Sequence, residues 1–158
     1  MKKEKALTPT ISALLEEFFG SYKPTAGRTV RQRIDLVRED LARQLEVEGP
    51  RELTTPQLAI LITERQFEPV DSFARTMRAP ELFYVLSTYL RPEFAMPGHL
   101  QQQTQLDVVS ALADMLWSRG LIRRHKLDEC AVLDFNYRMT SRRDDVRALR
   151  RAVFEARF

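Results

Sequence analysis

The chain has 158 residues, of which 44% are hydrophobic and 30% charged, and this balance is typical of one globular domain with its own core. Its single cysteine, Cys130, excludes an internal disulfide framework and any multi-cysteine zinc site. Met1 to Lys5 is basic, but no apolar segment follows, so we expect no secretory signal. The longest apolar runs, such as Leu58 to Ile62, are far shorter than the ~20 residues that span a bilayer. These features favour a cytoplasmic protein without membrane contact.

The formal net charge of +3 is unevenly distributed along the chain. Residues 1–117 carry 14 Lys and Arg against 16 Asp and Glu, a balance of −2, whereas residues 118–158 carry 11 against 6, a balance of +5. A basic C-terminal third of this kind suggests a polyanionic partner. A solvated surface of mixed charge explains the same numbers equally well.

The N-terminal half has the apolar spacing of amphipathic helices. A first helix is predicted from Ile11 to Phe19, with Thr8 or Thr10 as its N-cap and Gly20 at its end. A longer helix is predicted over 29–47, capped by Thr29 and stopped by Gly49-Pro50. Its apolar stripe consists of Val30, Ile34, Val37, Leu41 and Leu45.

Four more helical segments are predicted further along the chain. One runs over 56–67 after the capping residues Thr54-Thr55, and a short turn over 72–77 is capped by Asp71 or Ser72. Pro80 opens a helix that is apolar on several sides. A helix over 100–119 ends at Gly120, which is a natural C-cap.

The pattern changes its period after Cys130. Apolar residues at 131, 133, 135, 137 and 139 alternate with more polar ones, which predicts a half-buried strand. Leu121 to Leu127 is a candidate partner in a hairpin, and pairing across a dimer is the alternative. Ser141 then caps a last helix with an apolar stripe that includes Val146, Leu149 and Val153.

These segments predict a mainly α fold: a compact multi-helix bundle with a short β-hairpin or single strand near the C-terminus. We expect a disordered basic N-terminus over residues 1–7 and a helical bundle domain over 8–122. Residues 123–158 are expected to form the basic strand or hairpin and the C-terminal helix, packed on the same domain.

The sequence contains no pattern that predicts catalysis. His99 and His125 are far apart, and no Cys/His/Asp cluster has the spacing of metal ligands. Five glycines form no phosphate-binding loop, and neither Glu16-Glu17 nor Asp144-Asp145 converges on a substrate, because adjacent helical residues point in different directions. We therefore expect no enzymatic activity, no cofactor and no metal.

Two basic segments are candidate nucleic-acid contacts. The first is 119–126, where arginines past a helix end are well placed to bind phosphate, although natural edge strands also carry charge against aggregation. The second is the last helix, whose basic face suits nucleic acid or an acidic partner. The residues predicted to bind phosphates are Arg119, Arg123, Arg124, Lys126, Arg143, Arg147 and Arg150.

The order of these segments resembles the N-terminal core-binding domain of the tyrosine recombinases, or phage-type integrases. The resemblance covers roughly residues 8–125 and rests on four segments: Leu14 to Phe19, Thr29 to Leu45, Leu53-Thr54-Thr55-Pro56-Gln57-Leu58, and Leu116 to Ile122 with its Gly-Leu-Ile turn. It implies a helical domain that clamps DNA. Residues 66–98 look like an insertion, and Arg123 to Lys126 replace the usual Asn-Pro. The catalytic arginines and tyrosine of the family have no counterparts, so DNA contact without strand exchange is implied.

The C-terminal half is also similar to a winged-helix domain, in which the helix over 100–119 would enter the major groove and the hairpin would touch the backbone. Four glutamines at its start would then face base edges: Gln101, Gln102, Gln103 and Gln105. We therefore expect a non-catalytic DNA-binding protein. The alternative is a helical protein-interaction or homodimerisation module with no nucleic-acid role.

Overall fold

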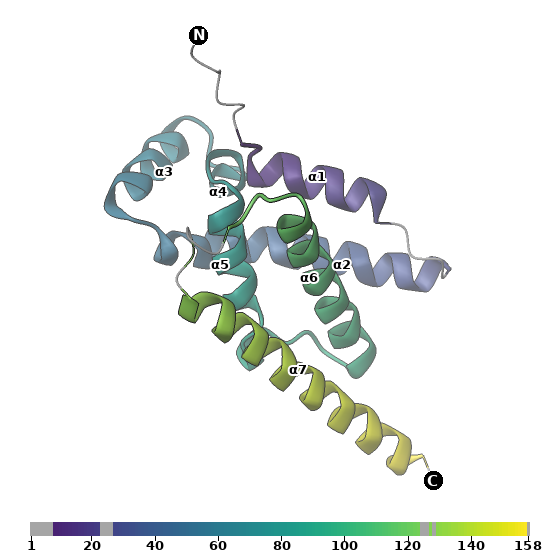
Figure 1. The fold of residues 1–158 in the computed structure, drawn as a ribbon. Coiled ribbons are helices and arrows are strands. Elements are labelled where there is room, and N and C mark those ends of the chain that lie inside the picture. The colour runs from purple at the N-terminus through teal and green to yellow at the C-terminus, as the bar shows by residue number, and fades with distance from the viewer. Residues whose placement is uncertain (1–7, 23–26, 124–126, 128, 158) are drawn as a thin grey trace.

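The fold is helical throughout the part of the chain that the structure, a computed structural model, describes: residues 8–22, 27–123, 127 and 129–157. These residues contain no strand, so the expected mainly α class is confirmed (Figure 1). The α-helices are α1 (Ile11–Ser21), α2 (Arg28–Glu48), α3 (Thr55–Phe67), α4 (Ser72–Thr76), α5 (Ala79–Tyr89), α6 (His99–Ser118) and α7 (Glu129–Ala156). Short 3-10 turns lie at Gly49–Glu52 and Pro92–Phe94.

α5 is the central helix of the core. Leu82, Phe83 and Leu86 are fully buried, as expected for a helix that is apolar on several sides. α2, α6 and α7 pack around it, and α1 packs against α4 and α5 (Figure 1). The apolar stripe of α2 supplies Val37, Leu41 and Leu45 to the same core, all of them fully buried.

Local signals set several helix ends where the sequence predicts them, although α1 runs past Gly20 and ends at Ser21. The Thr10 hydroxyl accepts a hydrogen bond from the Ala13 N–H at 3.2 Å and caps α1. Gly120 has φ +65°, and the Leu121 N–H donates to the Leu116 carbonyl at 3.0 Å, which closes α6 with a Schellman motif. α2 differs from the prediction: it starts at Arg28 after Gly27, so Thr29 lies inside the helix and does not cap it.

The strand predicted over 131–139 is wrong, because these residues form the first third of α7. Val132, Phe135, Met139 and Val146 recur at spacings of three, four and seven residues, and they face the core as one helical stripe. Leu133 and Tyr137 remain exposed, and their apolar side chains produced the false two-residue alternation. Ser141 lies in the middle of the helix and caps nothing.

α7 runs antiparallel to α6 and then extends beyond it. Near its start, the ring of Phe135 lies 5.0 Å from that of Phe83, which in turn contacts Trp117 near the end of α6. Further along, Arg142 Nη2 donates to Gln102 Oε1 at 2.8 Å, at the start of α6. The residues that follow Val146 therefore lie past the first turn of α6, and Figure 1 shows this end of α7 projecting from the bundle.

Candidate functional site

The C-terminal half of α7 carries arginines on one side of the helix. At about 100° per residue, four arginines of this half fall within a sector of about 100°, and Arg157 follows in the turn after Ala156. We call this set the basic stripe: Arg143, Arg147, Arg150, Arg151 and Arg157. Eight residues separate Arg143 from Arg151, its last member within α7, which corresponds to about 12 Å along the helix axis. Phe154 lies within the same sector and is 64% exposed.

The cations of the basic stripe are weakly neutralised. Arg143 Nη1 lies 3.7 Å from Asp107 Oδ1, and Arg147 Nη1 lies 3.6 Å from Asp144 Oδ1. Exposed pairs of this length contribute little energy and exchange readily for another anion. Arg150, Arg151 and Arg157 form no ion pair with any carboxylate of residues 8–22, 27–123, 127 and 129–157. The stripe is therefore available to a polyanion.

The structure separates the other predicted phosphate contacts from this stripe. Arg119 lies at the far end of α6, about 18 Å along the helix from Asp107, which is the partner of Arg143. It already pairs with Glu17, with Nη1 2.8 Å from Oε2, and this hydrogen bond holds the pKa of Glu17 below its ordinary value. Arg123 is exposed near the same end. Arg124 and Lys126 lie outside the described residues.

Two further arginines of α7 hold the fold together. Arg142 is 5% exposed, and its Nη1 donates to Asp145 at 2.9 Å while its Nη2 binds Gln102. Arg138 Nη1 donates to both the carbonyl and the hydroxyl of Ser87 on α5, each at 3.0 Å. Neither Arg138 nor Arg142 is among the phosphate contacts predicted from the sequence, and no structural role was predicted for them, because their partners on α5 and α6 are distant in the chain.

The four glutamines at the start of α6 are also occupied inside the protein. Gln101 donates to the Arg33 carbonyl at 2.9 Å, and Gln103 donates to Asp107 at 2.9 Å. Gln105 joins the loop before α6 by bonds to Phe94 and Met96, and Gln102 accepts from Arg142. These side chains position α6 against α2 and α7, so we assign them no role in reading bases.

α3 has its apolar side chains outside and its charged side chains inside. Leu61 is its one buried residue, whereas four large apolar residues are 36% to 83% exposed. We call the solvent-facing part of α3 its outward face: Leu58 and Ile62 lie on one flank and Ile60 and Phe67 on the opposite flank, with Val70 just after the helix. Amphipathic helices of globular domains normally have the reverse arrangement.

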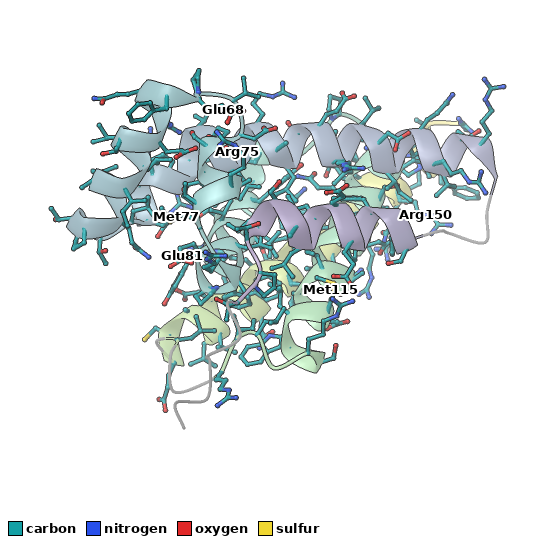
Figure 2. All side chains as sticks on the ribbon, turned by 90° about the horizontal axis from the view of Figure 1, so that it is seen from above. Glu68, Arg75, Met77, Glu81, Met115 and Arg150 are labelled. Carbon is teal, nitrogen blue, oxygen red and sulfur yellow. The ribbon has the colours of Figure 1, made fainter. Side chains whose placement is uncertain are left out.

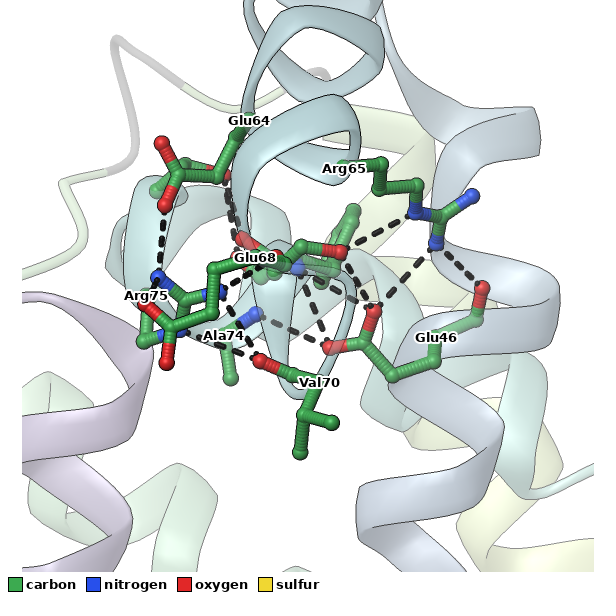
Figure 3. A network of polar contacts seen from close by, with 10 residues as sticks. Glu46, Glu64, Arg65, Glu68, Val70, Ala74 and Arg75 are labelled. Atoms are coloured by element: carbon green, nitrogen blue, oxygen red, sulfur yellow. Dashed lines mark hydrogen bonds and ion pairs between the residues drawn. The ribbon is translucent and has the colours of Figure 1, made fainter.

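Polar contacts with α2 and α4 hold α3 in this orientation (Figure 3). Arg65 Nη2 donates to the carbonyl of Glu46 at 2.8 Å and to its carboxylate at 3.2 Å. Arg75 Nη1 lies 2.6 Å from Glu64 and 3.1 Å from Glu68. Glu64 and Arg65 are the only charged residues of α3, so these contacts leave no charged residue of the helix itself on its outward face, although Glu68 and Asp71 beside Val70 are exposed.

A small polar pocket of about 270 Å³ lies where α5 meets the start of α7. Its walls include Glu52, Ser87, Thr88 and Arg138, and these side chains already hydrogen-bond to one another. Within the described ranges no buried side-chain nitrogen or oxygen lacks a partner, and no group of three or more His, Cys, Asp and Glu could hold a metal ion. No buried polar atom of the pocket is therefore left without a hydrogen-bond partner.

Comparison of the chain with protein-family models, curated proteins and solved structures found no match in any of the three. None of the described helices combines the length and the apolar composition needed to cross a bilayer. Two surfaces of the described chain are therefore the candidates for function: the basic stripe of α7 and the outward face of α3. Figure 2 places Arg150, on the stripe, far from Glu68 and Arg75, which lie beside α3.

Proposed function

We propose that this protein binds DNA without catalysing a reaction, and that the basic stripe of α7 makes the principal phosphate contacts. One observation carries the proposal: Arg150 and Arg151 lie on one side of a projecting helix end, Arg157 follows in the turn after it, and none of the three pairs with a carboxylate of the described chain. Arginine is the side chain best suited to phosphate, because its planar group donates two parallel hydrogen bonds.

The shape of the projecting end suits a duplex. A single α-helix fits the major groove of B-DNA, which is about 12 Å wide, and its flanking arginines then reach the phosphates on either side. The ion pairs of Arg143 and Arg147 are long and exposed, so exchanging Asp107 or Asp144 for a phosphate costs little. Asp145 lies on the opposite side of the helix and binds Arg142, away from this path.

The expected role of residues 119–126 becomes secondary in this proposal. Arg119 is engaged by Glu17, and it lies with Arg123 at the other end of α6 from the stripe. We also propose that the protein acts as the resemblance to the recombinase core-binding domain implies, as a helical domain that contacts DNA without strand exchange. The winged-helix interpretation needs a second strand in its wing, and the residues predicted for that strand, 131–139, are helical.

Two matched charge reversals test where DNA binds. Arg150→Glu/Arg151→Glu alters the stripe, and Arg28→Glu/Arg31→Glu makes the same change in net charge on exposed residues of α2. Fluorescence anisotropy with a labelled random duplex should show at least about a tenfold loss of affinity for the first variant and less than about threefold for the second. Equal losses would assign binding to overall charge, and an unchanged α7 variant would remove the stripe from the proposal.

A further inference from the structure

We propose that Phe154 is the residue of α7 that reads DNA sequence, by packing its ring against thymine methyl groups in the major groove. The inference rests on the DNA binding proposed above, in which the basic stripe contacts phosphates. Phosphate contacts position a protein on DNA but carry no sequence information, so a preference for sequence needs a side chain that reaches the bases. Within the described part of the projecting end of α7, Phe154 is the one apolar residue in the sector of the stripe (Figure 1).

Phe154 lies near the middle of that sector, between arginines. At about 100° per residue, it is about 40° around the helix from Arg150 and about 60° in the other direction from Arg151. A helix in the major groove turns the middle of its facing sector towards the base edges and the margins of the sector towards the phosphates of the two strands. The ring of Phe154 therefore faces the bases when the arginines on both sides of it bind phosphates.

The core of the protein does not explain a phenylalanine at this position. Val146 is the last buried residue of α7, and Phe154 lies eight residues further on, about 12 Å along the helix axis. Leu149 and Val153 lie on the side of α7 that continues the buried stripe, and both are half-buried. Phe154 lies on the basic side instead and is 64% exposed. Packing therefore accounts for the first two apolar residues but not for Phe154.

The thymine methyl group is the apolar group that the major groove presents. The edges of the other bases present hydrogen-bond donors and acceptors there, and a phenyl ring cannot pair with these. Contact between the ring and a methyl group removes apolar surface of both from water. The phosphate contacts of the stripe are the same for every sequence, so Phe154 adds a preference for thymine without changing the number of phosphates bound.

Duplexes that contain deoxyuridine in place of thymine test this contact, because the substitution removes the methyl group and keeps the base pair. Fluorescence anisotropy with two duplexes of A·T pairs, one with thymine and one with deoxyuridine, should show about threefold to fourfold weaker binding of the second by the wild type. Phe154→Ala should bind both duplexes equally. Its salt slope should equal that of the wild type, because no phosphate contact is lost.

Two further variants make the comparison specific. Leu133→Ala truncates an exposed apolar side chain of α7 outside the stripe, and it should keep the wild-type preference for thymine. Phe154→Leu keeps an apolar side chain but has no ring to stack on bases, so it should retain more than half of the preference. Circular dichroism confirms that each variant is folded.

The outcomes separate this inference from the proposed function. A wild type that binds both duplexes equally, or a Phe154→Ala variant that keeps the preference, overturns the role of Phe154 and leaves phosphate binding by the stripe intact. Complete loss of the preference in Phe154→Leu would assign the ring to stacking on bases and overturn the methyl contact. No binding of either duplex by the wild type at low salt would overturn the proposed function, and this inference with it.

Discussion

The carboxylate of Glu46, on α2, caps α4 across the structure by accepting hydrogen bonds from the Phe73 N–H at 3.0 and 3.2 Å. Asp71, the residue at the N-cap position, has φ +53° and makes no side-chain cap hydrogen bond. Neither Asp71 nor Ser72, the two residues predicted to cap this turn, therefore caps α4. The same carboxylate accepts from Arg65 and Ser72 (Figure 3). One side chain therefore joins α2, α3 and α4.

We predict that Glu46→Ala lowers the free energy of unfolding by about 2–3 kcal/mol, because hydrogen bonds to a charged, partly buried acceptor are lost and the α4 cap with them. Glu48→Ala is the matched control: its carboxylate is as buried as that of Glu46 but, among the described residues, forms an ion pair only with the exposed Arg51 at 3.3 Å, so the loss should stay below about 1 kcal/mol. Urea denaturation measures both values. Similar losses in the two variants would argue against the network.

We predict that position 49 requires glycine because a side chain would clash there, and not because of its backbone conformation. Its φ of −54° suits any residue, but a Cβ there would lie 2.6 Å from the fully buried ring of Phe73. Gly49→Ala should therefore cost about 1–3 kcal/mol of stability through overpacking, although alanine is the better helix former. Adding Phe73→Leu should return part of that loss in a double-mutant cycle. A Gly49→Ala variant as stable as the wild type would show that the ring moves freely.

Tyr89 should make the protein sensitive to alkaline pH. Its hydroxyl donates to Asp40 at 2.5 Å, and burial, followed by this carboxylate, raises the pKa of Tyr89 above its ordinary value. Because the folded pKa is the higher one, this contribution to stability is complete below the unfolded pKa of about 10 and is lost as the pH rises above it. Tyr89→Phe should flatten the fall in unfolding free energy above pH ~10. An unchanged slope would exclude Tyr89 as its source.

The extents of helices α1 to α6 were largely predictable because their information is local, with the exceptions of the start of α2 and the cap of α4. Caps such as Thr10 and breaks such as Gly120 lie within a few residues of the ends that they set. The start of α7 was not predictable in this way, because Arg142 interrupts its apolar stripe while Leu133 and Tyr137 imitate a strand. Only the fold shows that Arg142 is buried and bound to Gln102, forty residues earlier in the chain.

Of the two candidate surfaces, one was predictable from local spacing and the other depends on contacts between distant residues. Helical spacing alone places Arg143, Arg147 and Arg150 on one side of α7, and the sequence predicted these three residues. It placed Arg119 at the end of the helix over 100–119, but it did not predict that the basic stripe lies towards the opposite end of that helix. Nor did it predict the outward face of α3, because spacing does not say whether an apolar stripe meets a core or solvent. That answer depends on distant partners such as Glu46 and Arg65.

The salt dependence of DNA affinity tests the proposed function most directly. Five arginines in the basic stripe predict that the logarithm of the binding constant falls linearly with the logarithm of salt concentration, with a slope of about −4 to −5 for a duplex. Arg150→Glu/Arg151→Glu should make this slope shallower by about two. Anisotropy titrations of wild type and variant at several salt concentrations supply both numbers. No binding at low salt, or a slope that the α7 substitutions leave unchanged, would contradict DNA recognition by α7.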